Sequence, residues 1–272
     1  MNLQGKRVLI TGASGGIGHA IARAFSELKA DLILTGRRAE LLEPLSRELG
    51  AQTVIADLND RDEVKRLVAE AGQVDVYIAN AALPASGKIT SLHQAQIDAM
   101  LEINLRAPIE IARALAPEMA ARRCGHMVFV SSLAGKSAGP YSSLYSATKF
   151  GLRGFALGIR QDLAEDGVGV SVVLPGFISE AGMFADSGAK LPFGVGTKSP
   201  GQVAAGVIDV IHHDRAELSI APISLKLGSN LAAIAPGLSE RLQRLAGGSK
   251  IARELAEGQV EKRPEVDSGP GE

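Results

Sequence analysis

Tyr145 and Lys149 stand four residues apart in a stretch, residues 142–165, whose apolar spacing predicts an amphipathic helix. Side chains at this spacing project from the same face of a helix, so a phenol and an ammonium group would lie close together. An unperturbed tyrosine titrates near ~10, and a neighbouring positive charge lowers its pKa by favouring the phenolate. The pair predicts acid–base chemistry. Because this spacing is common in helices, the prediction depends on the rest of the sequence.

A glycine-rich turn lies far upstream of this pair. Residues 7–11 form a short apolar run, and the sequence Thr-Gly-Ala-Ser-Gly-Gly-Ile-Gly at 11–18 leads into a helical pattern over 17–29. Glycines permit a tight turn and a close approach of the backbone to a phosphate, and the first turn of a helix offers unpaired N–H groups to it. The turn predicts a pyrophosphate site. The residues expected to hold the cofactor here are Gly12, Ser14, Gly16, Ile17 and Gly18.

The spacing TGxxxGxG, taken together with Tyr145 and Lys149, resembles the short-chain dehydrogenase/reductase family in its single-domain branch. The resemblance covers roughly residues 5–221. It implies a Rossmann fold and a reversible hydride transfer between a nicotinamide and a carbonyl or secondary alcohol. It also implies that Tyr145 moves the proton and that Lys149 hydrogen bonds the nicotinamide ribose.

Two further catalytic residues follow from the same resemblance. Ser132, thirteen residues before Tyr145, matches the serine that orients the substrate carbonyl, while its neighbour Ser131 is expected to serve the backbone. Asn104 matches an asparagine that holds a water linking Lys149 to solvent. A solvent-facing Asn104 with no such role is the alternative.

The end of the second predicted strand bears on the choice of cofactor. An Asp or Glu at this place holds the ribose 2′-hydroxyl of NAD, and Gly36 occupies it here, followed by Arg37 and Arg38. Guanidinium groups suit a 2′-phosphate in charge and geometry, so NADP(H) is expected in preference to NAD(H). Alternatively, both arginines simply form the solvated start of the next helix.

Two other stretches resemble cofactor contacts of the family. Asp57 and Leu58 follow the third predicted strand at the adenine-contacting position, although Asp57 could instead cap the next helix. Asn80 and Ala81 follow the fourth strand where the family carries Asn-Asn-Ala-Gly. Here the first Asn and the Gly of that motif are both replaced by alanine.

A third stretch resembles the turn that presents its backbone to the nicotinamide carboxamide. Its residues are Pro175, Gly176 and Ile178. The usual threonine of this turn is replaced by Glu180, so one hydroxyl contact to the cofactor is in question.

Short apolar runs alternate with longer helical patterns along the chain. Strands are expected at 7–11, 31–35, 52–56, 74–80, 126–131, 168–174 and 217–221. Helices are expected at 17–29, 39–49, 61–71, 94–122, 142–165 and 200–212. This alternation predicts an α/β protein with a doubly wound parallel sheet and a ligand crevice at the carboxyl ends of its strands.

The predicted organisation is a catalytic domain over 1–223, a C-terminal helical extension over 224–256 and a disordered tail over 257–272. Within the extension, the Leu/Ala-rich stretch 224–245 predicts one or two amphipathic helices packed on the protein. Its apolar side chains could instead touch a membrane surface or cover the active site. The Gly-, Ser- and Pro-containing stretch 182–199 predicts a functional loop, such as a lid.

The composition narrows the classes of partner. The chain has 272 residues, 46% of them hydrophobic, and a formal net charge of −1, which speaks against nucleic acid or a polybasic membrane surface. The single Cys124 excludes an intrachain disulfide, and the first residues leave no room for a secretory signal. No run approaches the ~18 apolar residues of a transmembrane helix. A cytoplasmic protein is expected, with no metal because the five histidines lack ligand spacing.

The leading hypothesis is an NADP(H)-dependent oxidoreductase acting on a small-molecule carbonyl or alcohol. The stretches 82–87, 133–142 and 182–196 are mostly apolar and small, with larger side chains at Met183, Phe184, Leu191 and Phe193. They predict a hydrophobic substrate such as a lipid, a steroid-like ketone or a xenobiotic carbonyl. The resemblance also implies a homodimer or homotetramer through the helices at 94–122 and 142–165.

Two alternatives remain open. A 3-oxoacyl-carrier-protein reductase would need a basic patch for an acidic carrier near its entrance, for which Arg122, Arg123 and Arg153 are candidates. The second is a non-catalytic NADP-binding regulator. The intact set of Ser132, Tyr145 and Lys149 speaks against it, because a sensor needs no paired phenol and ammonium group.

Overall fold

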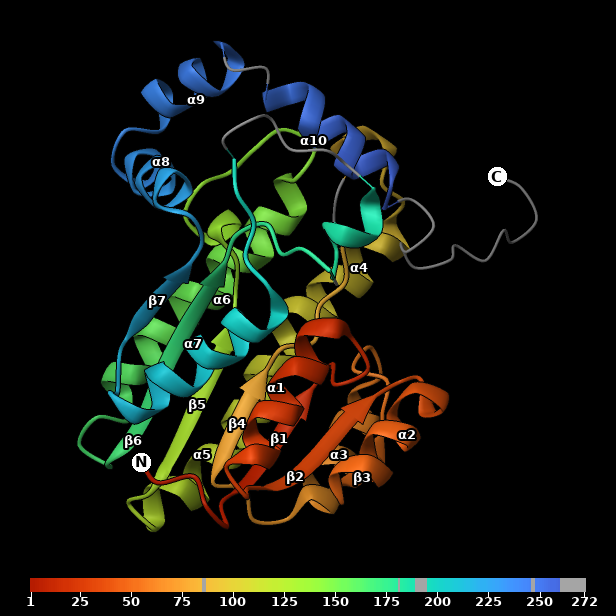
Figure 1. Cartoon of the computed structure of the whole chain (residues 1–272), viewed down its shortest axis with the longest axis vertical. Helices are drawn as coiled ribbons and strands as arrows, with labels where there is room; N and C mark the ends of the chain where they lie inside the picture. Colours follow the sequence, from red (N-terminus) through yellow and green to blue (C-terminus); the bar gives the residue numbers. More distant parts are fainter. Residues whose placement is uncertain (85–86, 181, 189–194, 246–247, 260–272) are drawn as a thin grey trace.

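The computed structural model describes residues 1–84, 87–180, 182–188, 195–245 and 248–259. Within these residues, seven parallel strands form one sheet in the order β3-β2-β1-β4-β5-β6-β7 (Figure 1). The strands are β1 (Arg7–Thr11), β2 (Asp31–Gly36), β3 (Gln52–Ile55), β4 (Val76–Ala79), β5 (Gly125–Val130), β6 (Val168–Pro175) and β7 (Glu217–Ile220). The predicted doubly wound α/β fold is confirmed, and the predicted strand ends differ by one or two residues.

Helices cover both faces of the sheet because its strands are apolar on both sides. Val8 and Ile10 pack into one core cluster and Leu9 into the other, as the two-residue period of a strand requires. The first cluster includes residues of α1 (Gly16–Glu27), α2 (Ala39–Leu49) and α7 (Pro200–His212). The second includes residues of α3 (Arg61–Ala71), α5 (Ala107–Ala121) and α6 (Ser143–Asp162).

The helix expected at 94–122 is interrupted. It consists of α4 (Gln94–Leu101), a π-helical turn (Glu102–Arg106) and α5. Pro108 explains the interruption, because it has no N–H to donate to the carbonyl of Asn104 four residues earlier. Pro117 lies inside α5 without such a break, so the presence of a proline in the sequence does not by itself locate the interruption.

The chain after β7 forms three helices, of which the first two correspond to the one or two amphipathic helices expected at 224–245. They are α8 (Ile223–Ile234), α9 (Pro236–Leu245) and α10 (Gly248–Glu257), and they lie together beyond the carboxyl ends of the strands (Figure 1). Gln259, just past α10, is buried and donates from Nε2 to the carbonyl of Met183 at 3.0 Å. The described chain therefore stays packed up to Gln259, and most of the predicted tail, 260–272, lies outside the described residues.

Candidate active site

A cavity of about 660 Å³ opens at the carboxyl ends of the central strands, where a doubly wound sheet is expected to bind its ligand. Its walls come from the residues after β4, β5 and β6, from the first turns of α1 and α6, and from the C-terminal helices. The lining is mostly apolar. The predicted site residues that line it are Ile17, Asn80, Ser132, Tyr145, Lys149, Pro175, Gly176 and Ile178.

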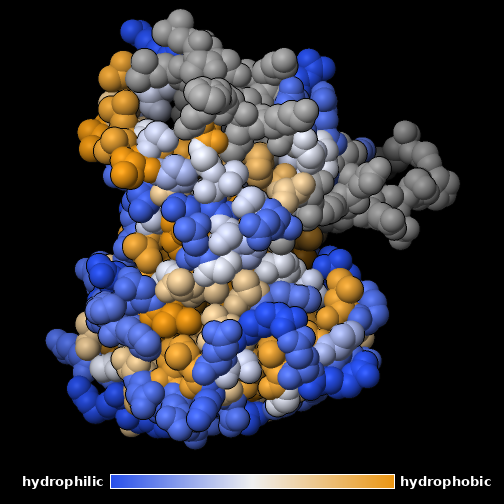
Figure 2. All heavy atoms as spheres, in the orientation of Figure 1, coloured by the Kyte–Doolittle hydropathy of each residue, from blue (hydrophilic) through white to orange (hydrophobic). Residues whose placement is uncertain are grey.

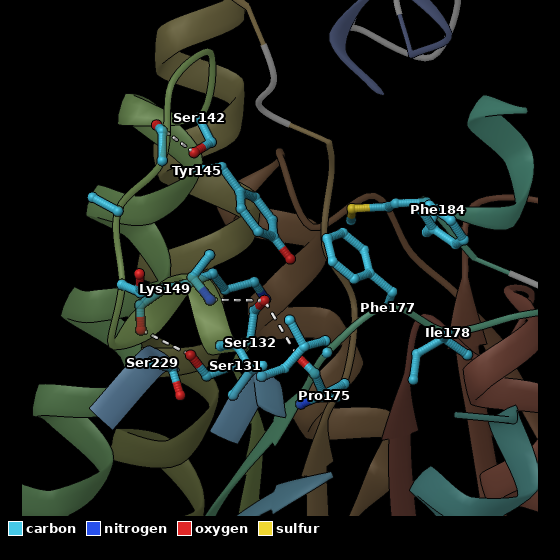
Figure 3. A pocket seen from close by; sticks show the side chains of 18 of the residues that line it. Ser131, Ser132, Ser142, Tyr145, Lys149, Pro175, Phe177, Ile178, Phe184 and Ser229 are labelled. Carbon is cyan, nitrogen blue, oxygen red and sulfur yellow. Dashed lines mark hydrogen bonds between the residues drawn. The ribbon is translucent and has the colours of Figure 1, made fainter. Parts of the chain in front are cut away.

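Ser132, Tyr145 and Lys149 converge on one side of this cavity, with Phe177 opposite Tyr145 (Figure 3). The Ser132 hydroxyl donates to the carbonyl of Pro175 over a long 3.5 Å and accepts from the Ala134 N–H at 3.1 Å. The Lys149 ammonium group donates to the carbonyl of Val130 at 3.0 Å. The same ammonium group lies 5.7 Å from the centre of the Tyr145 ring. The three side chains predicted to be catalytic thus share one end of the cavity.

The neighbouring Ser131 has a separate role. Its hydroxyl donates to the carbonyl of Lys149 at 2.9 Å, and the side chain is buried. This bond fastens the end of β5 to the middle of α6. Ser131 therefore serves the backbone, as expected from the sequence, and leaves Ser132 to face the cavity.

The acid–base properties of the pair differ from the prediction. Burial raises the pKa of Tyr145 to about 12, against a smaller lowering by its hydrogen bond with Ser132. Burial also lowers the pKa of Lys149 to about 8. The net shift of the Tyr145 pKa is therefore upward and not downward as expected, because desolvation of the phenol outweighs the interactions that favour the phenolate.

Asn104 is buried in the π-helical turn, and the solvent-facing alternative is excluded. Its Oδ1 accepts from the Leu83 N–H at 2.7 Å, and its Nδ2 donates to the Leu83 carbonyl at 3.0 Å. Nδ2 also lies 3.5 Å from the Thr148 hydroxyl, next to Lys149 in α6. The side chain therefore ties the loop after β4 to the catalytic helix. The main-chain carbonyl of Asn104 lacks its α-helical donor because residue 108 is proline.

The glycine-rich turn has the close packing that the sequence predicts. Gly12 is in the left-handed region with φ +65°, and a Cβ there would lie 2.7 Å from the Cα of Ala81. A Cβ on Gly18 would lie 2.3 Å from the carbonyl oxygen of Gly12. The residue before α1 is Gly15, which has no side chain that could accept hydrogen bonds from the first N–H groups of the helix. The turn therefore forms a cradle of backbone groups that could hold an anion.

Asn80 and Ala81 hold this turn in place. The Asn80 amide donates to the carbonyls of Thr11 and Gly12, both at 3.1 Å. The Thr11 hydroxyl in turn accepts from the N–H groups of Asn80 and Ala81 at 3.1 and 3.2 Å. The motif after β4, although two of its residues are replaced by alanine, thus holds the turn after β1 through these hydrogen bonds.

The predicted 2′-phosphate residues lie around the same turn. Arg38 donates from Nη2 to the carbonyl of Ser14 at 3.3 Å, and the Arg37 Nη1 lies 4.0 Å from the Asp57 carboxylate. The Arg37 side chain is 57% exposed, which leaves its guanidinium accessible to a ligand. Asp57 does not cap α3, because Asp60 accepts the hydrogen bonds of the first turn. The alternative for Asp57 is therefore excluded.

The remaining cofactor positions are held through the backbone. Leu58 is buried among core residues, so only its main chain could face a ligand. The Gly176 N–H donates to the carbonyl of Ile220 at 3.0 Å, and Ile178 is buried beside Lys198 in an isolated parallel bridge. Glu180, where the family has threonine, has φ +69°, a left-handed conformation that is unusual outside glycine.

Comparison with known proteins identifies the family. The sequence profile described as short chain dehydrogenase matches residues 6–191. The chain belongs to this family. Short-chain dehydrogenases are oxidoreductases that act on CH–OH and C=O groups, and the protein is such an enzyme. The ketoacyl reductase HetN of Nostoc sp. is 33% identical over 272 residues, a match that covers 95% of each chain.

Solved structures agree with this assignment. A putative betaketoacyl-ACP reductase superposes with a TM-score of 0.76 at 27% identity, covering 82% of this chain and 99% of that one. A metagenomic short-chain oxidoreductase in complex with NADP has a TM-score of 0.68 at 30% identity, with the same coverage. Both support the Rossmann-like fold of the short-chain dehydrogenase family for the whole sheet.

The C-terminal helices of this short-chain dehydrogenase cover the cavity, which was one of the alternatives left open for residues 224–245. Leu225, Ser229 and Leu231 of α8 line it, together with Ser239 of α9 and residues in and just after α10. The amphipathic pattern of 224–245 showed that one face is buried, but not what it covers. Across the cavity, the rings of Phe177 and Phe184 lie 5.1 Å apart. Leu191 and Phe193 of the predicted lid lie outside the described residues.

The arginines considered as a carrier-binding patch are engaged elsewhere. Arg122 donates to the carbonyl of Val74 at 2.9 Å, and Arg123 donates to the carbonyl of Glu165 at 2.8 Å, both near the amino ends of strands. Arg153 pairs with Glu217 through Nε at 2.5 Å. None of the three lines the cavity, so this part of the prediction is wrong.

The described part of the chain contains neither a metal-binding cluster nor a membrane-spanning helix. No group of three or more His, Cys, Asp or Glu side chains within it could hold a metal ion. None of the helices described is both long and apolar enough to cross a membrane.

Proposed function

We propose that this short-chain dehydrogenase uses NADP(H) in preference to NAD(H) and acts on the carbonyl or secondary alcohol of a hydrophobic substrate. The observation that carries the proposal is the convergence of Tyr145, Ser132 and Lys149 at one end of a mostly apolar cavity. The glycine turn and Ile17 at the start of α1 adjoin that end.

The residues present fit a dinucleotide phosphate. A Cβ on Gly12 would collide with the backbone of Ala81, and one on Gly18 with the backbone of Gly12, so glycine lets the turn pack closely beside the N-terminus of α1, where a pyrophosphate would bind. Arg37 and Arg38 lie next to Ser14 and Asp57, at the edge where a ribose 2′-phosphate would lie. Their positive charge suits that group better than the acidic residue of an NAD site.

Each of the three catalytic side chains has its own role in the reaction. When bound, the nicotinamide supplies or accepts the hydride. Tyr145, a phenol because burial raises its pKa to about 12, gives its proton to the carbonyl oxygen in reduction. In oxidation the phenol first loses its proton to solvent, and the resulting phenolate then accepts the proton of the alcohol. Ser132 can exchange its long bond to Pro175 for a bond to the same oxygen. The Lys149 ammonium group stabilises negative charge that develops on the phenol.

A proton path would complete the cycle. Lys149 and the π-helical turn meet at Thr148, whose hydroxyl is 3.5 Å from the Asn104 side chain. The Asn104 amide is engaged with Leu83, so a water between Lys149 and solvent would bind its main-chain carbonyl instead. We therefore assign Asn104 to the path through its backbone, with Pro108 as the residue that keeps that carbonyl available.

The assembly is part of the proposal. The resemblance implies a homodimer or homotetramer through α4–α5 and α6. Leu101 of α4 and Phe150 of α6 support it, because they are 38% and 42% exposed on those helices. Large apolar side chains at such positions are suited to a subunit interface.

A 3-oxoacyl-carrier-protein reductase is the second candidate, favoured by the names of the Nostoc relative and of one solved structure. It uses the same catalytic residues and differs in the group attached to the acyl chain. Tyr141 lines both the cavity and a smaller depression that carries Lys88 and Arg253. These two cations, rather than Arg122 or Arg153, would meet an acidic carrier.

The function is tested by following NADPH absorbance with methyl ketones of increasing length and with 3-oxoacyl thioesters. Each methylene buried in the apolar cavity adds about 0.8 kcal/mol, so kcat/KM is expected to rise about fourfold per CH₂ until the cavity is filled. Rates that do not depend on chain length would contradict a hydrophobic substrate. Tight NADPH binding without turnover of any carbonyl would favour the non-catalytic regulator, and turnover of thioesters alone would favour the second candidate.

The choice of cofactor gives a separate prediction. Arg37→Ala is expected to weaken NADPH binding about ten- to a hundredfold and NADH binding little, because a charge-assisted hydrogen bond contributes about 1.5–3 kcal/mol. Titration of the tryptophan-free protein by nicotinamide fluorescence measures both constants. Arg47→Ala is the control, since Arg47 is exposed on α2 and bonds only the carbonyl of Glu43. Equal losses for the two cofactors would remove the assignment of Arg37.

A further inference from the structure

The two faces of α8 have different surroundings. Leu225 and Ser229 face the cavity, and Ala232 is buried on the same side. Ile223, Leu227 and Ile234 point the other way and are 75%, 65% and 84% exposed. The adjoining α9 adds Leu238, which is 51% exposed. These four side chains are called here the outer face. Figure 2 shows an apolar group on the part of the surface that α8 and α9 form.

The outer face is unusual for this molecule. The other exposed large hydrophobic residues of the described chain are Leu41, Ile55, Ile89, Leu101 and Phe150, which are spread over five elements and are 36–58% exposed. The outer face brings four such side chains, all at least half exposed, within residues 223–238. A concentrated apolar patch of this kind marks an interaction surface, because single exposed side chains are common and clusters are not.

The size and charge of the patch favour a lipid bilayer over another protein. A stable protein interface uses about 20–30 residues on each side, many more than the outer face offers. Four aliphatic side chains on two short helices are sufficient for shallow insertion between lipid headgroups. Residues 223–257 contain five Lys or Arg and three Asp or Glu, a net charge of +2, in a chain whose net charge is −1. The described cations among them include Lys226 and Arg241.

We propose that the outer face docks this protein on the surface of an anionic lipid bilayer. Ile223, Leu227, Ile234 and Leu238 enter the interface, while the basic residues of α8–α10 meet the headgroups. Docking in this orientation brings the wall of the apolar cavity to the bilayer, since α8 separates the two. The proposal concerns binding alone and does not depend on the proposed function.

The test is flotation of the full-length protein with vesicles of phosphatidylcholine, with and without about one third phosphatidylserine. The protein is expected to float with the anionic vesicles and to be released when the salt is raised from about 0.1 to about 1 M, because screening shortens the range of the attraction. The variant Ile223→Ser/Leu227→Ser/Ile234→Ser is expected to partition at least tenfold more weakly. The control Leu41→Ser/Ile55→Ser, exposed on α2 and β3, is expected to bind as the parent does.

Fold and assembly are measured on the same samples by circular dichroism and sedimentation velocity. Failure of the parent protein to bind any vesicle would overturn the proposal, and so would equal binding by the triple-serine variant. A change in oligomeric state in that variant, with no vesicle binding by the parent, would assign the outer face to a second copy of the chain.

Discussion

Tyr145→Phe is expected to lower the rate of carbonyl reduction about a thousandfold and to leave NADPH binding unchanged. The substitution removes the one hydroxyl that the cavity places next to both Ser132 and Lys149. General acid catalysis by a positioned side chain contributes about 10²–10⁴ in rate, and phenylalanine keeps the ring while losing the proton. Single-turnover rates with saturating NADPH measure the chemical step, and cofactor titration measures binding.

Tyr141→Phe is the matched control for this substitution. Tyr141 also lines the cavity and stands four residues before Tyr145, but it lies in the turn before α6, and its ring centre is 5.9 Å from the Lys88 ammonium group. Its loss of a hydroxyl should change the rate severalfold at most. Full activity in Tyr145→Phe, or an equal loss in both variants, would contradict the assignment of Tyr145 as the proton donor.

The positions of the catalytic side chains could be predicted from the sequence because each follows a local rule. Tyr145 and Lys149 share a helix, and Ser132 follows a strand, so secondary structure alone carries all three to the same edge of the sheet. The same holds for the glycine turn, since its spacing is fixed by the close contacts of Gly12 and Gly18. The alternation of strand and helix likewise specified the parallel sheet, although it left the strand ends uncertain.

Other properties of the site depend on residues that are distant in sequence. The pKa of Tyr145 is raised by burial, which no spacing on α6 reveals. Asn104 bonds the backbone of Leu83, a contact across 21 positions that follows only from the fold. The place of α8 over the cavity depends in the same way on how the chain turns after β7. Sequence patterns therefore located the reacting groups. The pKa of Tyr145 and the position of α8 over the cavity could be found only from the tertiary structure.

Glu217 illustrates a tertiary contact with a large expected effect. Its carboxylate at the start of β7 pairs with Lys136, which follows the Ser132 turn, and with the Arg153 Nε at 2.5 Å. Arg153 lies four residues beyond Lys149 on the catalytic helix. The Lys136 ammonium group also lies 3.4 Å from the Asn230 side chain of α8. One carboxylate thus joins the serine turn, the catalytic helix and the sheet edge.

Glu217→Ala is expected to lower the free energy of unfolding by about 3 kcal/mol, because it leaves two cations without their carboxylate. The three side chains are 11–29% exposed, so water compensates only partly for the loss. Glu48→Ala is the control: it breaks the Arg23–Glu48 pair, in which both side chains are 49% exposed, and should cost less than about 1 kcal/mol. Urea denaturation of both variants measures the difference.

The double variant Glu217→Ala/Lys136→Met distinguishes two causes of instability in Glu217→Ala: the loss of the ion pairs, and the cost of leaving a buried cation without a partner. The second substitution removes Lys136, which at 11% exposure is the less exposed of the two cations that pair with Glu217, and replaces it with an apolar side chain of similar length. If desolvated charge causes the instability, the double variant is more stable than Glu217→Ala although it restores neither of the two lost ion pairs. If the second substitution lowers stability further, the stabilising contribution comes from Lys136 itself, through its packing or its bond to Asn230, and the argument from buried charge fails.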